Sequence, residues 1–486
     1  MKRALLLIIF VASSIVSFAQ EPEYWTGLVE DREAYQQIPL KVTLLKRDYQ
    51  VLPSSVSLRQ YCPPAASQGS HGTCTAWSTT YAARTIAEAV KWGWTDQKVI
   101  QDEAFAPIFV YANVKNRDGR DPECKKGIRI SNALQTLKDE GAPKLKHFNT
   151  QCADRIDTWV RDEAKDYRID SYNRLFGYEQ QSQDAKIKVV KKALAGKNPV
   201  IISMHLPNNF FRPQSDVWER GSVNDAPYYH AMCVVGYDDN KAGGAFEIMN
   251  SWGNYWANKG FLWVKYKDFA DFVDFAFEMR VKKNMVIDNQ NKKEVKDVPK
   301  PQPKPVIVDE TSNLSGSMYF QLSTGETLTY RLSKEKLPIY KIKEKLISGT
   351  RYTAYITCNE PAYVYMIGSD LDNNVSQLFP PEGENISPAV DAANDFALPG
   401  EDMFYELDDN TGKEYYCLLF SSKELDIKSI TEKVKARRGE FTDVISNVLK
   451  EDGLVINESI YSKEKMSFKT VTKGSIVPLI VELSHK

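Results

Sequence analysis

The chain has 486 residues, of which 42% are hydrophobic and 26% are charged, and its formal net charge at pH 7 is −1. These values are ordinary for a folded soluble protein, and the length corresponds to two to four domains. A net charge near zero gives no electrostatic reason to expect nucleic acid or an anionic membrane as a partner.

Residues 1–19 have the pattern of an export signal. Lys2 and Arg3 form a basic start, and the apolar stretch from Ala4 to Val16 is short for a bilayer span. Small residues in Ser17-Phe18-Ala19 predict cleavage after Ala19. The alternative, an uncleaved membrane anchor, is disfavoured by this length. We therefore expect an exported protein, periplasmic or extracellular, with no integral membrane segment after cleavage.

The most informative stretch is a polar loop, Ser67 to Thr73, that runs into an apolar segment from Ala76 to Val90. A loop followed by an apolar run without Gly or Pro predicts a helix, with Cys74 in its first turn. The helix dipole and the unpaired N–H groups there favour a thiolate, the nucleophilic form of cysteine. Because most lone cysteines are small buried hydrophobic residues, a reactive role requires a base, an orienting group and an oxyanion donor elsewhere in the chain.

Two downstream segments carry such groups. His230 stands at the head of an apolar strand, and Asn250-Ser251-Trp252-Gly253 follows the next strand. Together with Gln68, which precedes Cys74 by six residues, they resemble the papain-like cysteine peptidases over about residues 53–280. The resemblance implies a two-lobed α+β fold, with the nucleophile helix on one lobe, the His and Asn on the other, and a cleft between them.

The resemblance also implies a role for each group. Cys74 attacks the scissile carbonyl, and His230 takes and returns the proton as half of a thiolate–imidazolium pair. Asn250 orients the imidazole without adding charge. The Gln68 amide and the Cys74 backbone N–H bind the oxyanion, and Trp252 shields the His230–Asn250 hydrogen bond from water. We expect a protein or peptide substrate and no cofactor.

The surroundings of the nucleophile depart from the family signature Cys-Gly-Ser/Ala-Cys-Trp/Tyr. His71 replaces a cysteine that normally forms a disulfide, and Thr75 replaces an aromatic residue; Trp77, two positions further on, cannot be assumed to take over its role. Neither change removes a catalytic atom. His71 lies three residues before Cys74, but no second Cys-x-x-His or Cys-x-x-Cys accompanies it, so we interpret His71 as a loop residue and expect no metal.

Export permits disulfides among the seven cysteines. We predict one pair, Cys124 with Cys152, which flanks a predicted helix in a loop-rich part of the peptidase region. Cys233 stands in an apolar run, which favours a buried free thiol. Cys358 and Cys417 lie in strand-like runs, where they either pair or pack.

Apolar periodicity places further elements in the peptidase region. The expected helices and strands are 105–114, 130–140 and 184–195, then 199–204, 245–249 and 261–266. The N-terminal extension, residues 20–52, has no room for the long inhibitory propeptide of many family members. Either the enzyme needs no such inhibitor, or the segment from Glu21 to Arg32 has a smaller role.

The C-terminal part is set apart by composition. Alternating prolines from Pro299 to Pro305 predict an extended spacer within a linker of residues 286–313; a Pro-rich docking motif is the alternative. Residues 314–486 read as a mainly β domain that resembles, around Tyr363 to Ile367, a domain of unknown function often fused to bacterial exported enzymes. Its predicted strands are 351–358, 362–368, 415–420 and 476–483, and residues 430–449 form one helix or two broken at Gly439.

Three functions stay open at this stage. The first is an exported cysteine peptidase whose C-terminal domain binds substrate, a surface or a protein partner. The second is a catalytically silent interaction protein on the same fold, which the altered neighbours of Cys74 allow. The third is an acyltransferase or amidase that uses the same triad.

Overall fold

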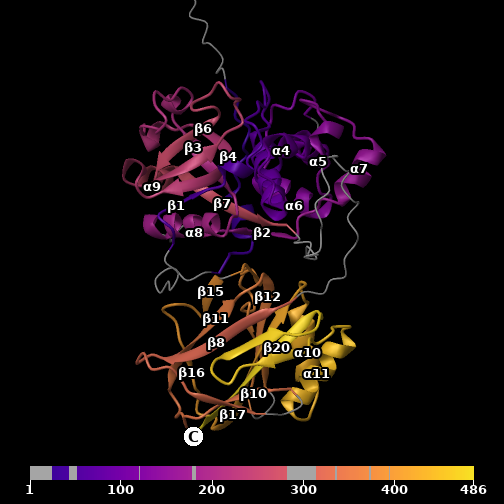
Figure 1. Ribbon diagram of the computed structural model, residues 1–486, viewed down its shortest axis with the longest axis vertical. Helices are drawn as coiled ribbons and strands as arrows, with labels where there is room; N and C mark the ends of the chain where they lie inside the picture. The colour runs from indigo at the N-terminus through magenta and orange to yellow at the C-terminus, as the bar shows by residue number, and fades with distance from the viewer. Residues whose placement is uncertain are drawn as a thin grey trace, which may run out of the picture.

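The computed structural model describes residues 24–42, 52–119, 121–177, 182–281, 313–333, 337–370, 374–392 and 394–486. The predicted signal peptide and all of the predicted linker except Asn313 lie outside these ranges. The described residues form two units, a helix-and-sheet unit and a mainly β unit, which Figure 1 shows one above the other.

One half of the first unit is helical. Its longest helix starts at Cys74 and runs without a break through α2 (Cys74–Ala76), η2 (Trp77–Arg84) and α3 (Thr85–Trp92). It ends at Gly93, which adopts the left-handed conformation that favours glycine (φ 67°). The helix predicted over 76–90 is therefore confirmed. Around it lie α4 (Gln97–Asp102), α5 (Pro107–Asp118), α6 (Ile130–Asp139) and α7 (Thr158–Lys165).

The other half is a seven-stranded antiparallel sheet in the order β2-β7-β3-β4-β5-β6, with β1 paired to β4. The central strand β4 is apolar and buried over most of its length, as expected for a strand covered on both faces. Helices α8 (Gln183–Ala195) and α9 (Tyr266–Phe272) pack beside this sheet (Figure 1). The strands are β1 (Ser55–Ser57), β2 (Ser171–Arg174), β3 (Val200–Leu206), β4 (Tyr228–Asp238), β5 (Ala245–Met249), β6 (Phe261–Lys265) and β7 (Val273–Arg280).

The second unit is a three-layered β domain. One sheet has the order β13-β12-β17-β20-β10-β9, with β14 on β12, and the other has the order β15-β11-β8-β19-β18, with β16 on β11. Its strands are β8 (Ser315–Leu322), β9 (Tyr330–Ser333), β10 (Ile339–Ile342), β11 (Arg351–Cys358), β12 (Ala362–Ser369), β13 (Val375–Phe379), β14 (Ala389–Val390), β15 (Asn394–Leu398), β16 (Tyr405–Glu406), β17 (Gly412–Ser421), β18 (Ser459–Tyr461), β19 (Met466–Thr470) and β20 (Ile476–His485).

Alternation along β17 shows how the three layers are built. Leu418 and Phe420 join the core between the two sheets, whereas Cys417 and Leu419 join the core on the other face. That outer face is covered by α10 (Ile427–Lys435) and α11 (Phe441–Glu451), visible beside β20 in Figure 1. The predicted helical region is thus two helices, with Gly439 between them. Among the described residues, none of the helices combines the length and the hydropathy that crossing a bilayer requires.

The cysteines follow the sequence-based expectations. Cys124 and Cys152 form the predicted disulfide, with their Cα atoms 5.8 Å apart. Cys233 is a buried free thiol, and Cys358 and Cys417 are likewise free and buried. The two strand cysteines therefore pack rather than pair.

We expect the core of the second unit to depend on β20. Leu479 is fully buried between the sheets, and Leu479→Ala should cost about 2–5 kcal/mol of the unfolding free energy of this unit. Ile460 on β18 is 67% exposed, and Ile460→Ala should change this unfolding free energy by about 0.5 kcal/mol or less. Denaturant unfolding followed by far-UV circular dichroism measures the unfolding free energy of both variants. Equal effects of the two substitutions would contradict this placement of the core.

Candidate active site

The loop-to-helix junction places the Cys74 thiol against the central strand. Cys74 is completely buried, and the backbone N–H of Ala231 on β4 donates a hydrogen bond to its sulfur. The loop before it is fixed to the end of β5, since the Gln68 N–H donates to the Ser251 carbonyl at 2.9 Å. Residues from both halves of the unit therefore meet at one sulfur atom.

His230 and Asn250 lie together, as the resemblance implies. The Nε2 of His230 is 2.7 Å from the Oδ1 of Asn250. The indole of Trp252 stacks on the imidazole with ring centroids 4.5 Å apart, so it covers the hydrogen bond as predicted. Within the described residues, the Nδ1 of His230 has no hydrogen-bond partner, which leaves this atom available for a proton.

Gln68 presents its amide in one orientation. The Ser251 hydroxyl donates to Oε1 at 2.6 Å, so Nε2 must point the other way. Nε2 donates to the His71 carbonyl at 2.7 Å and to the Trp25 carbonyl at 3.0 Å. His71 is a loop residue, as interpreted from the sequence, with its Nδ1 3.3 Å from the Gln68 carbonyl.

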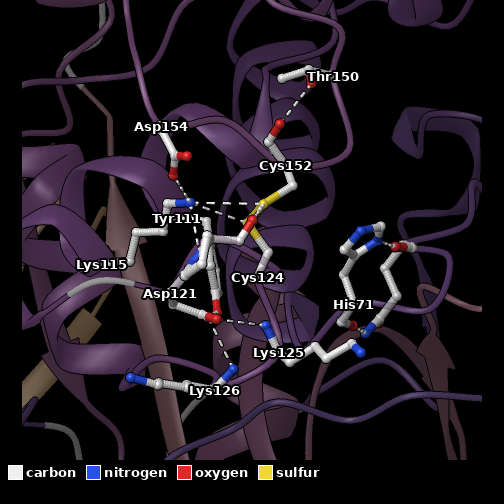
Figure 2. Close-up of a disulfide and its surroundings, with 12 residues drawn as sticks. His71, Tyr111, Lys115, Asp121, Cys124, Lys125, Lys126, Thr150, Cys152 and Asp154 are labelled. Atoms are coloured by element: carbon white, nitrogen blue, oxygen red, sulfur yellow. Dashed lines mark hydrogen bonds and ion pairs between the residues drawn. A yellow bond between two sulfur atoms is a disulfide. The ribbon is translucent and has the colours of Figure 1, made fainter.

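The predicted disulfide holds one wall of the site (Figure 2). The carbonyl of Cys124 accepts a hydrogen bond from the Gly72 N–H at 2.7 Å, two residues before the nucleophile. The Asp121 carboxylate accepts from the backbone N–H groups of Lys125 and Lys126 at 3.1 and 2.9 Å, which fixes the turn that follows. The Lys115 ammonium lies 3.4 Å from the Cys124 sulfur. These contacts therefore hold the turn of residues 121–126 in a fixed position next to the loop that precedes Cys74.

An N-terminal segment that the sequence analysis did not place lies across this site. We call residues 24–31 the strap. The Tyr24 ring stacks on Trp252 at 5.0 Å, and the Trp25 carbonyl accepts from Gln68 Nε2 and from Trp252 Nε1 at 2.9 Å. The Trp25 carbonyl thus accepts from the Gln68 amide, the side-chain group that was predicted to donate to an oxyanion. The available sequence signal was an aromatic pair, Tyr24-Trp25, within the segment from Glu21 to Arg32 that follows the predicted cleavage site.

The middle of the strap pairs with the disulfide-held turn. Ile128 N–H donates to the Gly27 carbonyl at 3.1 Å, and Val29 N–H donates to the Ile128 carbonyl at 3.2 Å. Gly27 sits directly against the loop of the nucleophile, because a Cβ atom on it would lie 2.1 Å from the Gly72 carbonyl carbon. Only glycine allows this approach.

The end of the strap contacts both halves of the unit. Asp31 pairs with Arg129 at 2.8 Å, and the Glu30 carboxylate accepts from the Ser203 hydroxyl on β3 at 2.8 Å. Burial raises the pKa of Glu30 to about 7. Nearby, His205 pairs with Asp274, a partner that the sequence did not indicate, and this hydrogen bond raises the pKa of His205.

Glu30, His205 and Asp274 each present one ligand-type atom, and these atoms lie within 4.8 Å of one another. The ion pair of His205 with Asp274 and the hydrogen bond from Ser203 to Glu30 account for this cluster without a metal. We therefore interpret it as the contact that seats the end of the strap on β3.

Burial shifts the pKa values of Cys74 and His230. Burial raises the pKa of the Cys74 thiol to about 12 and lowers the pKa of His230 to about 4. Both shifts favour the neutral thiol and the neutral imidazole, because exclusion of water disfavours the charged forms. The thiolate–imidazolium pair stays a prediction for a site that is open to water.

Comparison with known proteins gives two family matches. Residues 52–272 match the model of the papain family cysteine proteases, and residues 345–424 match a domain of unknown function, DUF4384. The second match lies within the β unit, in the region where the sequence suggested such a domain.

Three curated relatives are similar to part of this chain. A peptidase C1-like protein of Acanthamoeba polyphaga mimivirus is 26% identical over 42% of this chain and 65% of its own length. A cysteine protease of Blomia tropicalis is 33% identical over 21% of this chain and 29% of its own. A cathepsin L-like proteinase of Fasciola hepatica is 20% identical over 43% and 60%. The chain thus covers less than two thirds of each relative.

Among solved structures, xylellain, a cysteine protease from Xylella fastidiosa, is similar with a TM-score of 0.43 and 21% identity. The match covers 54% of this chain and 97% of that one. A procathepsin L2 proteinase from Tenebrio molitor larval midgut has a TM-score of 0.44 and 16% identity, covering 54% and 79%.

We expect the strap to control the reactivity of Cys74. With a pKa of about 12, about one thiol in 10⁵ is ionised at pH 7, so iodoacetamide should alkylate Cys74 slowly, and the rate should rise about tenfold per pH unit between pH 7 and 9. Gly27→Ala should displace the strap and accelerate alkylation at pH 7 by about tenfold or more, since its Cβ cannot fit against Gly72.

Intact-mass analysis with peptide mapping measures this rate. Gln36→Ala, an exposed position on α1 (Arg32–Gln36), is the matched control and should leave it unchanged. Rapid alkylation of the unaltered protein with no pH dependence would contradict a buried neutral thiol.

Proposed function

Because residues 52–272 are a papain-family cysteine protease domain, we propose that this protein is an exported cysteine peptidase that hydrolyses peptide bonds through a Cys-His-Asn triad. The observation that carries the proposal is that His230 Nε2 is held by Asn250 and its Nδ1 has no partner among the described residues. The residues next to these two contact the other site residues: the Ala231 N–H donates to the Cys74 sulfur, and the Ser251 hydroxyl donates to Gln68.

The first half of the reaction requires the thiol proton to move to His230. Nδ1 is the atom that receives it, because Nε2 is directed to Asn250. The Cys74 sulfur then attacks the carbonyl carbon of the peptide, and the carbonyl oxygen becomes an oxyanion. Gln68 Nε2 and the Cys74 backbone N–H stabilise this charge, and Ser251 keeps the Gln68 amide in place.

The second half releases the products. The intermediate collapses when His230 gives its proton to the leaving amine, which leaves a thioester on Cys74. A water molecule, deprotonated by His230, attacks the thioester and frees the carboxylic acid. Trp252 keeps the imidazole in position through both steps, since it stacks on one face of the ring.

The described form of the enzyme is a latent one. Cys74 and His230 are fully buried, and Gln68 Nε2 already donates to the Trp25 carbonyl. A substrate carbonyl therefore reaches the thiol only after the strap has left. Departure of the strap also admits water, which restores the conditions for a thiolate–imidazolium pair.

An epoxide-type cysteine-peptidase inhibitor tests the proposed activity. In the Gly27→Ala protein we expect a single adduct that is absent after Cys74→Ala and forms at least tenfold more slowly after His230→Ala, because the thiol then lacks its base. His147→Ala, on an exposed histidine that pairs with Glu163, is the control. Absence of any adduct on reduced, folded Gly27→Ala protein would favour a catalytically silent protein.

Gln68 tests the oxyanion site separately from the nucleophile. In the Gly27→Ala background, where the strap no longer occupies Nε2, Gln68→Ala should lower kcat for a small peptide substrate by about 10²–10³ with little change in KM. Steady-state kinetics at saturating substrate measures the effect. A change in kcat of less than about threefold would exclude Gln68 from the transition state.

A further inference from the structure

We propose that the C-terminal unit, residues 313–486, has a function within this chain: it binds the N-terminal segment that carries the strap and so holds the strap over Cys74. The effect of this binding on activity rests on the proposed peptidase function, whereas the binding itself depends only on contacts between the two parts of the chain.

The bound segment is residues 37–42, which we call the root of the strap. Its backbone is used on both edges. Toward the first unit, Arg174 N–H donates to the Pro39 carbonyl at 3.0 Å, and Lys41 N–H donates to the Arg174 carbonyl at 3.0 Å. Toward the second unit, Leu40 N–H donates to the Asn385 carbonyl at 2.9 Å, and Ser387 N–H donates to the Leu40 carbonyl at 2.9 Å.

The root is therefore an extended segment sandwiched between the two units. Leu40 forms a parallel bridge with Arg174 on β2 and another with Ile386. Pairing of this kind recognises an extended backbone through its N–H and carbonyl groups, as when a peptide adds to a sheet edge. The second unit supplies one side of this groove with residues 385–387.

Side-chain amides of the second unit add to this pairing. Asn385 Nδ2 donates to the Gln37 carbonyl, and Asn394 Nδ2 donates to the Val42 carbonyl at 3.0 Å. Together with the backbone pairs, these hydrogen bonds connect the second unit to three carbonyl groups and one N–H group of the root. The contact is thus directed at the main chain of the root along its whole length.

A buried ion pair fixes the register of the root. Lys41 is 9% exposed, and its ammonium lies 2.6 Å from the Glu278 carboxylate of β7 and 2.5 Å from the Asp391 carboxylate of the second unit. Burial alone would lower the pKa of Lys41, but the two carboxylates outweigh it and raise the pKa. A buried ammonium needs both partners, so loss of Asp391 destabilises the seated root.

The root and the strap are joined by a short rigid piece. Between them lies α1, capped by Asp31, and its Tyr35 is buried with its hydroxyl donating to the Phe176 carbonyl at 2.7 Å. Tyr35 also stacks on Phe275 at 4.4 Å. The strap is therefore joined to the root through a helix of five residues, and a root that leaves its groove removes the chain anchor on the C-terminal side of that helix.

The two units also touch without the root, and this provides a matched control. Tyr363 on β12 donates to the Asp170 carboxylate at 2.6 Å, and the Arg280 guanidinium lies 5.3 Å from the centre of the Tyr363 ring. Tyr363→Phe removes one hydrogen bond between the units and leaves the contacts of the root intact.

The test uses the full-length protein and two readouts at pH 7. The first is hydrogen–deuterium exchange of the strap, in which Val29 N–H is a protected reporter because it donates to Ile128. The second is the alkylation rate of Cys74. We expect Asp391→Ala to raise both by about tenfold or more, because it leaves the Lys41 ammonium with one partner. Asp391→Asn, which keeps the side-chain shape, should give a smaller increase.

The control variant Tyr363→Phe should change neither the exchange of the strap nor the alkylation rate of Cys74 by more than about twofold. Thermal unfolding should show that each variant remains folded. If Asp391→Ala and Asp391→Asn leave the strap as protected as Tyr363→Phe does, the inference is wrong. If the strap opens but no variant cleaves a peptide, the C-terminal unit holds the strap and the proposed peptidase function is wrong.

Discussion

The site depends on one packing contact, in which the first turn of the helix that begins at Cys74 is pressed against strand β4. The thiol accepts a hydrogen bond from the Ala231 N–H, so its position is set relative to the residue next to His230. The helix belongs to one half of the first unit and β4 to the other. Any shift between the halves would therefore separate Cys74 from His230, the proposed nucleophile and base.

The surrounding hydrogen bonds serve this contact from both sides. The Gln68 N–H donates to the Ser251 carbonyl, and the Gly72 N–H donates to the Cys124 carbonyl, so the loop before Cys74 is tied to β5 and to the disulfide-held turn. Each tie removes freedom from a loop that otherwise has no regular structure. The oxyanion donor is positioned by the same ties, because Ser251 also orients the Gln68 amide.

Covering this contact has an electrostatic consequence. Cys74 and His230 are both buried, and burial moves their pKa values in the directions that favour the neutral forms. The strap lies against the same region, because the Trp25 carbonyl accepts hydrogen bonds from Gln68 Nε2 and Trp252 Nε1. These contacts place the strap on Gln68, a proposed site residue, and on Trp252, which stacks on His230.

The sequence by itself determined the parts of this protein that depend on local order. The helix from Cys74, strands such as β5 and β20, the burial of Cys233 and the pairing of Cys124 with Cys152 all follow from apolar spacing, from residue types or from positions near in the chain. Cys74, His230 and Asn250 were predicted as nucleophile, base and orienting residue because their motifs occur in a fixed order.

Only the tertiary structure decided what covers the site and what holds that cover. Glu30 meets Ser203 across 173 positions of the chain, and Lys41 meets Asp391 across 350. Neither pair has a motif, because a lysine or a glutamate becomes a specific contact only when the fold removes it from water and places one partner beside it. The pKa shift of Cys74 also depends on the fold, because burial is a property of the folded chain and no residue near Cys74 in the sequence encodes it.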